Sequence, residues 1–416
     1  MNGAALLLVV LAGVAADPPV SWQPDEFPVS YWAGPPVAAN TLDAWRTVAD
    51  AHFTFAVPGS GYSMEDNRKM LDFCRQVGLK GLVVDRRIRC KIVDEEGWQG
   101  KVARLASDYA DHPALFGYYL HDEPNYAWFE ALGKVHGEFL RLDPAHPAFI
   151  NLFPTYASVS QLGTPTYSDH LDKYLGIVKP VVLSYDHYCL MNDGRDRVDY
   201  FENLELIRAY AARYDVPAWN VILSWSHLGY RDPTDAEMRW QVYTSLAYGM
   251  KGILYFIYWT PDPAAPPDRV AIVDSKGKPT KRYPAIRQLN GEMRTLGKLL
   301  LGLTSTGVYH TGPIPRGCRR TLGDLPLRLP DDQPLLIGFF KDPHGADYAM
   351  IVNRDHGKPQ EVRVGLKEHV VGVAEISPQD GSPSTVPITG GLFRLSLEAG
   401  GGRLVRLETR FQYPRR

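Results

Sequence analysis

The segment GYYLHDEPN, residues 117–125, places two carboxylates side by side directly after a run of β-forming residues. Repulsion between Asp122 and Glu123, together with partial burial, is expected to raise one of the two pKa values, so that the protonated group can act as a general acid. Pro124 then ends the strand and stiffens the turn. An acidic helix start capped by Asn125 is the structural alternative. The strand that precedes the pair favours a chemical role.

A second carboxylate lies in an apolar and aromatic run. In VVLSYDHYCL, residues 181–190, Asp186 is surrounded by side chains that would make an unpartnered charge costly, so it has either a chemical task or an arginine partner. Asp85 is a weaker case, because arginines follow it within residues 86–89. An ion pair or a role in positioning a substrate fits Asp85 better than catalysis.

These carboxylates sit in a chain that alternates short β-forming runs with longer amphipathic stretches, the pattern of repeated βα units. Such a pattern in about 275 residues favours a (β/α)8 TIM barrel over an open doubly wound sheet, since no Gly-rich phosphate loop follows the first strand. The expected strands are residues 27–32, 53–58, 81–85, 115–121, 148–153, 181–188, 219–225 and 252–259. The expected helices include residues 64–77, 99–109, 126–142, 197–214, 233–248 and 283–300.

In such a barrel the active site lies at the carboxyl ends of the strands. Besides the carboxylates Asp122, Glu123 and Asp186, these ends are rich in aromatic, His and Asn side chains. Aromatic faces stack on the C–H faces of sugar rings, and two carboxyl groups can divide the work of cleaving a glycosidic bond, so we expect a carbohydrate site. The expected substrate-binding residues are Tyr31, Trp32, Asp85, Tyr119, His121, Asn125, Asn151, Tyr185, His187, Trp225, His227, Tyr258 and Trp259.

The sequence also indicates how the chain divides into a signal peptide, the barrel and a C-terminal domain. Residues 1–16 read as a signal peptide cut before Asp17, which predicts a secreted or periplasmic protein with no membrane association after cleavage. Residues 17–303 form the expected barrel. Residues 304–416 show short alternating runs between Gly, Pro and Asp, which predict a small antiparallel β-sandwich domain.

Composition excludes several functions. Lys plus Arg number 45 against 47 Asp plus Glu, a balance that argues against nucleic-acid binding. The four cysteines are scattered without a CxxC motif, so free thiols are favoured over a zinc site, although a Cys74–Cys90 bridge is an alternative. No HxH or HxxxH pair is present, and neither a metal nor another cofactor is expected.

The barrel half resembles glycoside hydrolases of the (β/α)8 kind, especially bacterial enzymes related to clan A and to the beta-galactosidase type. The resemblance covers about residues 27–310 and rests on GYYLHDEPN, LDPAHPAFINLFP (142–154), LSYDHY, the run 233–259 and the run 273–300. It implies a glycosidase in which Glu123, at the end of strand four, is the acid/base. The β-domain is an appendage commonly seen in such enzymes.

The chain departs from this pattern at strand seven. Clan A enzymes usually place a nucleophilic Glu there, whereas this chain has Ser-Trp-Ser-His at 224–227, and Glu237 is better explained as part of a helix capping box with Thr234. Three alternatives stay open. In the first, Asp186 replaces the missing carboxylate. In the second, the Asp122–Glu123 pair supports a substrate-assisted N-acetylhexosaminidase, because the adjacent Asp-Glu pair resembles that of such enzymes. In the third, the barrel binds carbohydrate without catalysis.

Overall fold

We describe a computed structural model of the chain, which covers residues 22–261, 269–320, 324–330 and 332–410. The expected signal peptide, residues 1–16, lies outside the described residues. No helix within these residues is long and apolar enough to cross a membrane.

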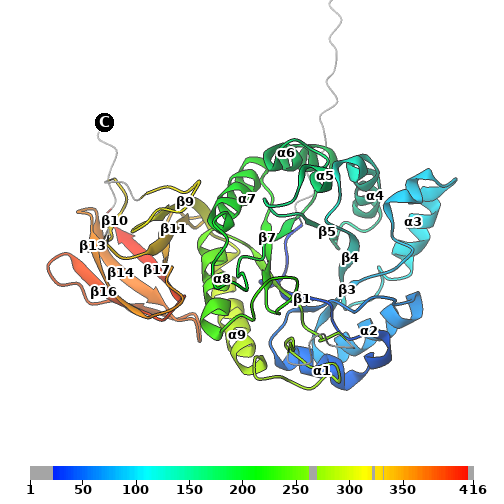
Figure 1. The fold of residues 1–416 in the computed structure, drawn as a ribbon, viewed down its shortest axis with the longest axis horizontal. Helices are drawn as coiled ribbons and strands as arrows, with labels where there is room; N and C mark the ends of the chain where they lie inside the picture. Colours follow the sequence, from blue (N-terminus) through cyan, green and yellow to red (C-terminus); the bar gives the residue numbers. More distant parts are fainter. Residues whose placement is uncertain (1–21, 262–268, 321–323, 331, 411–416) are drawn as a thin grey trace, which may run out of the picture.

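The first part of the chain is a parallel eight-stranded barrel inside a ring of helices (Figure 1). The strands pair in the order β1-β8-β7-β6-β5-β4-β3-β2, and each of these pairings is parallel. At the β1–β2 seam, the Thr54 amide donates to Val29 O at 2.8 Å and Ser30 Oγ donates to Phe55 O at 2.7 Å. The strands are β1 Val29–Trp32, β2 Phe55–Ala56, β3 Lys80–Val83, β4 Leu115–Asp122, β5 Ala148–Leu152, β6 Leu183–Asp186, β7 Ala218–Leu223 and β8 Gly252–Phe256. The predicted TIM barrel is confirmed.

Side-chain caps mark the start of several helices. Ser63 and Asp66 form a capping box before α2, and Thr234 and Glu237 form the predicted capping box before α8. The helices are α1 Leu42–Asp50, α2 Met64–Val77, α3 Trp98–Ser107, α4 Phe129–Leu142, α5 Val159–Leu162, α6 Tyr167–Val178, α7 Tyr200–Tyr214, α8 Asp235–Ala247 and α9 Tyr283–Leu300. Short 3-10 turns are η1 Val37–Ala39, η2 Cys90–Asp94 and η3 Tyr126–Trp128.

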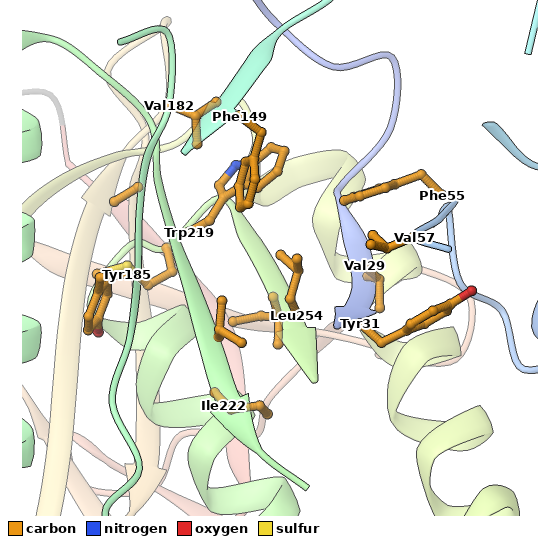
Figure 2. Packing of buried hydrophobic residues seen from close by; sticks show 14 of the residues in the cluster. Val29, Tyr31, Phe55, Val57, Phe149, Val182, Tyr185, Trp219, Ile222 and Leu254 are labelled. Atoms are coloured by element: carbon orange, nitrogen blue, oxygen red, sulfur yellow. The ribbon is translucent and has the colours of Figure 1, made fainter. Parts of the chain in front are cut away.

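Aromatic rings fill the barrel core at the amino-terminal ends of the strands. Phe55 and Phe116 stack at 3.9 Å between centroids, and Trp219 lies 5.6 Å from Phe149 (Figure 2). Gly252 makes room for this packing, because a Cβ there would lie 2.8 Å from the Trp219 ring. Much of the aromatic content of the chain therefore stabilises the barrel.

The second part of the chain is an antiparallel β-domain, as predicted. One sheet has the order β10-β13-β16 and the other β15-β14-β17-β12-β11-β9, with a separate apolar core between them. The strands are β9 Thr304–His310, β10 Leu327–Arg328, β11 Leu335–Lys341, β12 Asp347–Asn353, β13 Gln360–Leu366, β14 Val370–Ile376, β15 Pro383–Thr385, β16 Leu392–Leu397 and β17 Gly402–Thr409.

Helix α8 joins the two parts. Ten of its thirteen residues are buried, because one side faces the barrel and the other faces β11 and β12 (Figure 1). The contact is close: a Cβ at Gly338 would lie 1.9 Å from Ala247 O. All four cysteines lie within the described residues, and each is free, as favoured from the sequence.

Candidate active site

The carboxyl ends of the strands surround a cavity of about 290 Å³. Its position is the one expected for the active site of a (β/α)8 barrel. The lining residues are Trp32, Asp122, Glu123, Phe149, Asn151, Tyr156, Asp186, Tyr188, Val221, His227, Leu228, Tyr230, Leu254 and Phe256.

Strands β4, β5 and β6 bring the three predicted catalytic carboxylates together. Asp122 is the last residue of β4 and Asp186 the last of β6, while Asn151 lies between them on β5. The Asn151 amide donates to Asp186 Oδ1 at 2.9 Å and to Asp122 Oδ1 at 3.3 Å, and Ser184 Oγ donates to Asn151 Oδ1 at 2.9 Å. Ser184 thus orients Asn151, and Asn151 in turn orients Asp186 and Asp122.

Glu123 adopts a strained backbone conformation. Its φ is +43°, in the left-handed region that side-chain-bearing residues rarely adopt, while its amide still donates to Asn151 O at 2.8 Å. Such strain costs on the order of 1–3 kcal/mol and persists only where the surrounding structure imposes it. The turn directs the chain sharply away from β4 at the residue whose side chain enters the cavity.

All three carboxyl groups have pKa values above their usual range. Burial and the neighbouring charge of Asp122 raise the pKa of Glu123 to about 7, against the opposing effect of a hydrogen bond with Asp186. Burial, followed by the charges of Glu123 and Asp122, raises the pKa of Asp186 well above its usual range. Asp122 is exposed at the end of β4, yet the protein around its carboxyl group desolvates it enough to raise its pKa, an effect that a hydrogen bond from Asn151 opposes. The cluster therefore retains protons near neutral pH.

Glu123 and Asp186 lie side by side, and each carboxyl group affects the pKa of the other. The pair therefore shares the proton that the cluster retains near neutral pH.

Opposite the carboxylates, the cavity wall is apolar. Strands β7, β8 and β1 contribute Val221, Leu254, Phe256 and Trp32, and β5 adds Phe149. Within the described residues, no Lys or Arg lines the cavity. Burial also lowers the pKa of His227, so this imidazole is neutral at pH 7. The cavity is acidic on one side and apolar on the other.

Of the predicted binding residues, Trp32, Asn151 and His227 line the cavity. Tyr119 lies behind it with its ring 4.5 Å from that of Trp32, and its buried hydroxyl has no hydrogen-bond partner among the residues that the structure describes. Trp225 supports His227 from behind, with the rings stacked at 5.3 Å.

The structure places three further predicted residues beside the cavity, outside its lining. His121 Nδ1 lies 2.7 Å from the carbonyl oxygen of Asp122. The Asn125 side chain accepts from the Ala127 amide and so caps η3, the structural alternative considered for it. Trp259 is buried, and a Cβ at Gly277 would lie 2.6 Å from its ring.

Four predicted binding residues are packed inside the protein rather than in the cavity. Tyr31 and Tyr258 are buried and stack on each other at 4.4 Å. Tyr185 and His187 flank Asp186 and are also fully buried, because successive side chains of a strand point to opposite faces. His187 lies 3.5 Å from the Asp199 carboxylate.

Asp85 is a structural ion-pair partner and does not line the cavity. The Arg87 guanidinium donates to Asp85 Oδ2 at 2.7 Å, and the Tyr109 hydroxyl donates to the same oxygen at 2.6 Å. Although burial opposes it, these hydrogen bonds hold the pKa of Asp85 below its usual range. This geometry matches the ion-pair alternative for Asp85 and places Asp85 outside the cavity lining.

Sequence reasoning missed several lining residues. Tyr188 follows Asp186 by two positions and lines the same cavity. Because side chains of a strand alternate with a period of two, this spacing could have predicted it. Tyr156, Leu228 and Tyr230 lie on loops whose paths no periodicity reveals. Tyr230 Oη donates to Tyr156 Oη at 3.3 Å, which joins two of these loops.

The end of β7 carries no carboxylate, and Glu237 does not replace one. Its carboxylate accepts from the Thr234 amide at 2.8 Å and from Arg231 Nε at 2.8 Å, so it caps α8 as predicted. Arg231 also pairs with Asp196 at 2.6 Å and thereby connects the loops after β6 and β7. In the described parts of the chain, no three His, Cys, Asp or Glu side chains gather to hold a metal ion.

Comparison with known proteins gives matches in structure alone. No protein-family model matches the chain, and no curated protein sequence matches it. The beta-galactosidase from Bacillus circulans sp. alkalophilus superposes with a TM-score of 0.61 at 9% identity, over 92% of this chain and 99% of that one. Gan42B, a GH42 beta-galactosidase from G. stearothermophilus, gives 0.60 at 9% identity over 94% and 99%. The chain shares the fold of these beta-galactosidases.

At such low identity the comparison establishes the architecture, and the resemblance of fold to bacterial beta-galactosidases is confirmed. The chain also aligns with the beta-galactosidase from the psychrophilic Marinomonas ef1 at a TM-score of 0.48 and 9% identity, over 68% of this chain and 63% of that one.

Proposed function

We propose that the protein is a glycoside hydrolase that cleaves O-glycosidic bonds of a poly- or oligosaccharide, with Glu123 as the general acid/base. One observation carries the proposal: Glu123 has a pKa raised to about 7 and lies beside two further carboxylates in a cavity at the carboxyl ends of the strands. A carboxylic acid that keeps its proton near neutral pH can donate it to a leaving glycosidic oxygen. The shared fold with beta-galactosidases supports this chemistry.

Asp186 is the proposed second carboxylate. In the free protein, burial and the neighbouring charges favour the protonated form of Asp186. The proposed role therefore requires that a substrate, when it separates the pair, leaves the proton on Glu123 and makes Asp186 the anion that faces the sugar. Asp186 would then attack the anomeric carbon in a retaining mechanism, whereas an inverting one would need room for a water between the two groups.

The same geometry suits a substrate-assisted reaction. There the acetamido oxygen of the sugar attacks its own anomeric carbon, Asp186 or Asp122 orients the acetamido group, and Glu123 protonates the leaving oxygen. The absence of a carboxylate at the end of β7 favours this alternative. Hydrolysis of N-acetylhexosaminides without hydrolysis of plain glucosides or galactosides would establish it, and the reverse result would remove it.

The proposed substrate is uncharged. Since the described lining contains three carboxyl groups and no Lys or Arg, it offers a uronic acid no cationic partner. Secretion or a periplasmic location belongs to the proposal as well and is supported by the apolar run at residues 4–14 of the sequence.

The test compares the wild type with Glu123→Gln on a glycan panel scored for released products. The amide has the shape of the acid but no proton to donate, so turnover should fall by roughly 10²–10⁴-fold while calorimetric binding of the glycan persists. Glu130→Gln, an exposed carboxylate on α4, is the matched control and should keep full activity. Full activity of Glu123→Gln would reject the assignment.

A carbohydrate-binding barrel without catalysis is the second candidate, favoured by the missing carboxylate at the end of β7. It predicts calorimetric binding of a glycan with no product from the wild type. Detectable turnover of any glycan that Glu123→Gln abolishes would exclude it.

A further inference from the structure

Leu228 holds an apolar side chain almost entirely in solvent at the opening of the cavity. It lines the cavity, yet 93% of its surface is exposed. Its φ is +45°, a conformation that disfavours residues with a branched side chain, and the next residue, Gly229, has a φ of +111°. The exposed side chain gains no packing that would offset this strain.

Backbone hydrogen bonds fix the turn that presents Leu228. The Tyr230 amide donates to His227 O at 2.7 Å, and Ser226 Oγ donates to Tyr230 O at 2.9 Å. The Asn192 amide, from the loop after β6, donates to Gly229 O at 2.9 Å. Because the turn is tied at both ends and from the side, these bonds hold the backbone of Leu228 at the opening of the cavity.

A wall of rings connects Leu228 with the interior of the cavity. The Trp225 and His227 rings are stacked 7° from parallel, and His227 lies 4.9 Å from Phe256. The carboxylates lie on the other side, on β4 and β6. A sugar bound at Glu123 would therefore extend its leaving group past these rings toward the opening.

We infer that Leu228 and the His227 ring, which Trp225 supports from behind, form a binding subsite for the leaving group. This subsite recognises the apolar face of a second sugar ring or an aryl group. This inference rests on the proposed hydrolase function. An exposed apolar side chain at the mouth of a site gains from contact with a C–H face or a ring when the substrate covers it.

The test uses substrates that share one sugar and differ in the leaving group. Leu228→Asn removes the apolar surface and suits the positive φ, so the variant should fold at least as well as the wild type. We expect kcat/KM for a disaccharide or aryl glycoside to fall on the order of tenfold, as for other lost apolar contacts with substrate. The glycosyl fluoride of the same sugar should be hydrolysed unchanged, since fluoride is too small to reach Leu228.

Two further variants sharpen the result. Leu228→Met should restore the disaccharide rate, because it returns apolar surface to the same place. Val371→Asn, at an exposed apolar residue of the C-terminal domain, should change neither rate.

An equal fall for both substrates, or no fall for either, would overturn the subsite while leaving the hydrolase function intact. If the wild type hydrolysed neither the fluoride nor any glycoside, the proposed function itself would be overturned, and the subsite with it.

Discussion

The charge of Asp122 sets part of the pH range in which Glu123 can act as an acid. Burial is the larger cause of the raised pKa of Glu123, and the negative charge of Asp122 is the second. Replacing Asp122 with Asn removes that charge and keeps the shape of the side chain. The pKa of Glu123 should therefore fall from about 7 toward its ordinary value of 4.5 without reaching it, since burial remains.

The direction of the effect on activity follows from the role of the proton. A general acid works while protonated, so kcat/KM falls as the pH rises through its pKa in the free enzyme. A loss of about one pH unit, the low end for a charge at close range, would move the basic limb from about pH 7 to about pH 6. At pH 8 the protonated fraction would then fall from about one in eleven to about one in a hundred, roughly ninefold.

The assay is kcat/KM against pH for a substrate whose leaving group needs protonation, such as a disaccharide. The position of the basic limb, rather than the maximal rate, is the readout, because Asp122→Asn can lower the rate at every pH for other reasons. Glu130→Gln provides the control, since this exposed carboxylate on α4 lies outside the cavity lining and should leave the limb in place. A limb that stays at pH 7 or moves upward would refute the electrostatic coupling between Asp122 and Glu123.

Three other substitutions have clear outcomes. Asn151→Ala removes the amide that holds two carboxylates and should lower kcat at least tenfold with little change in melting temperature, measured by kinetics and calorimetry together; an unchanged kcat would show that the carboxylates need no such support. Gly338→Ala forces a methyl group against the backbone of Ala247 and should lower the free energy of unfolding by about 1–3 kcal/mol in urea denaturation. Unaltered stability would mean that the barrel and the β-domain shift apart enough to make room for the methyl group. Arg231→Met removes the guanidinium that Asp196 and Glu237 share and leaves His356 as the ion-pair partner of Asp196, so it should cost about 2 kcal/mol in the same assay, whereas a stabilised variant would show the ion pairs to be a net burden.

The barrel could be predicted because its elements carry strong local signals. Helices α2 and α9 begin and end at the predicted residues, Met64–Val77 and Tyr283–Leu300. Helix α6, Tyr167–Val178, was not predicted, although Thr166 caps it with its side chain. Its buried residues Leu171, Tyr174, Leu175 and Val178 recur at helical spacing, so the sequence does carry the helical period there.

The site could be predicted in position but only partly in membership. Sequence order identified the strand ends and thus Glu123, Asp186 and Asn151, all of which line the cavity. It did not reveal which side of a strand end faces inward. Tyr185 and His187 were therefore included although both are buried away from the cavity, while Tyr188, which lines it, was omitted. Loop residues such as Leu228 depend on turns that only the folded chain specifies.

Helix α8 has a consequence for how the whole chain loses its structure. With ten of thirteen residues buried between the barrel and the β-domain, it has almost no face suited to water. Removing the residues after 303 would uncover that surface and invite aggregation. The two parts should therefore melt in one cooperative transition, in which damage to β11 or β12 also releases the loop before α8 that presents Leu228.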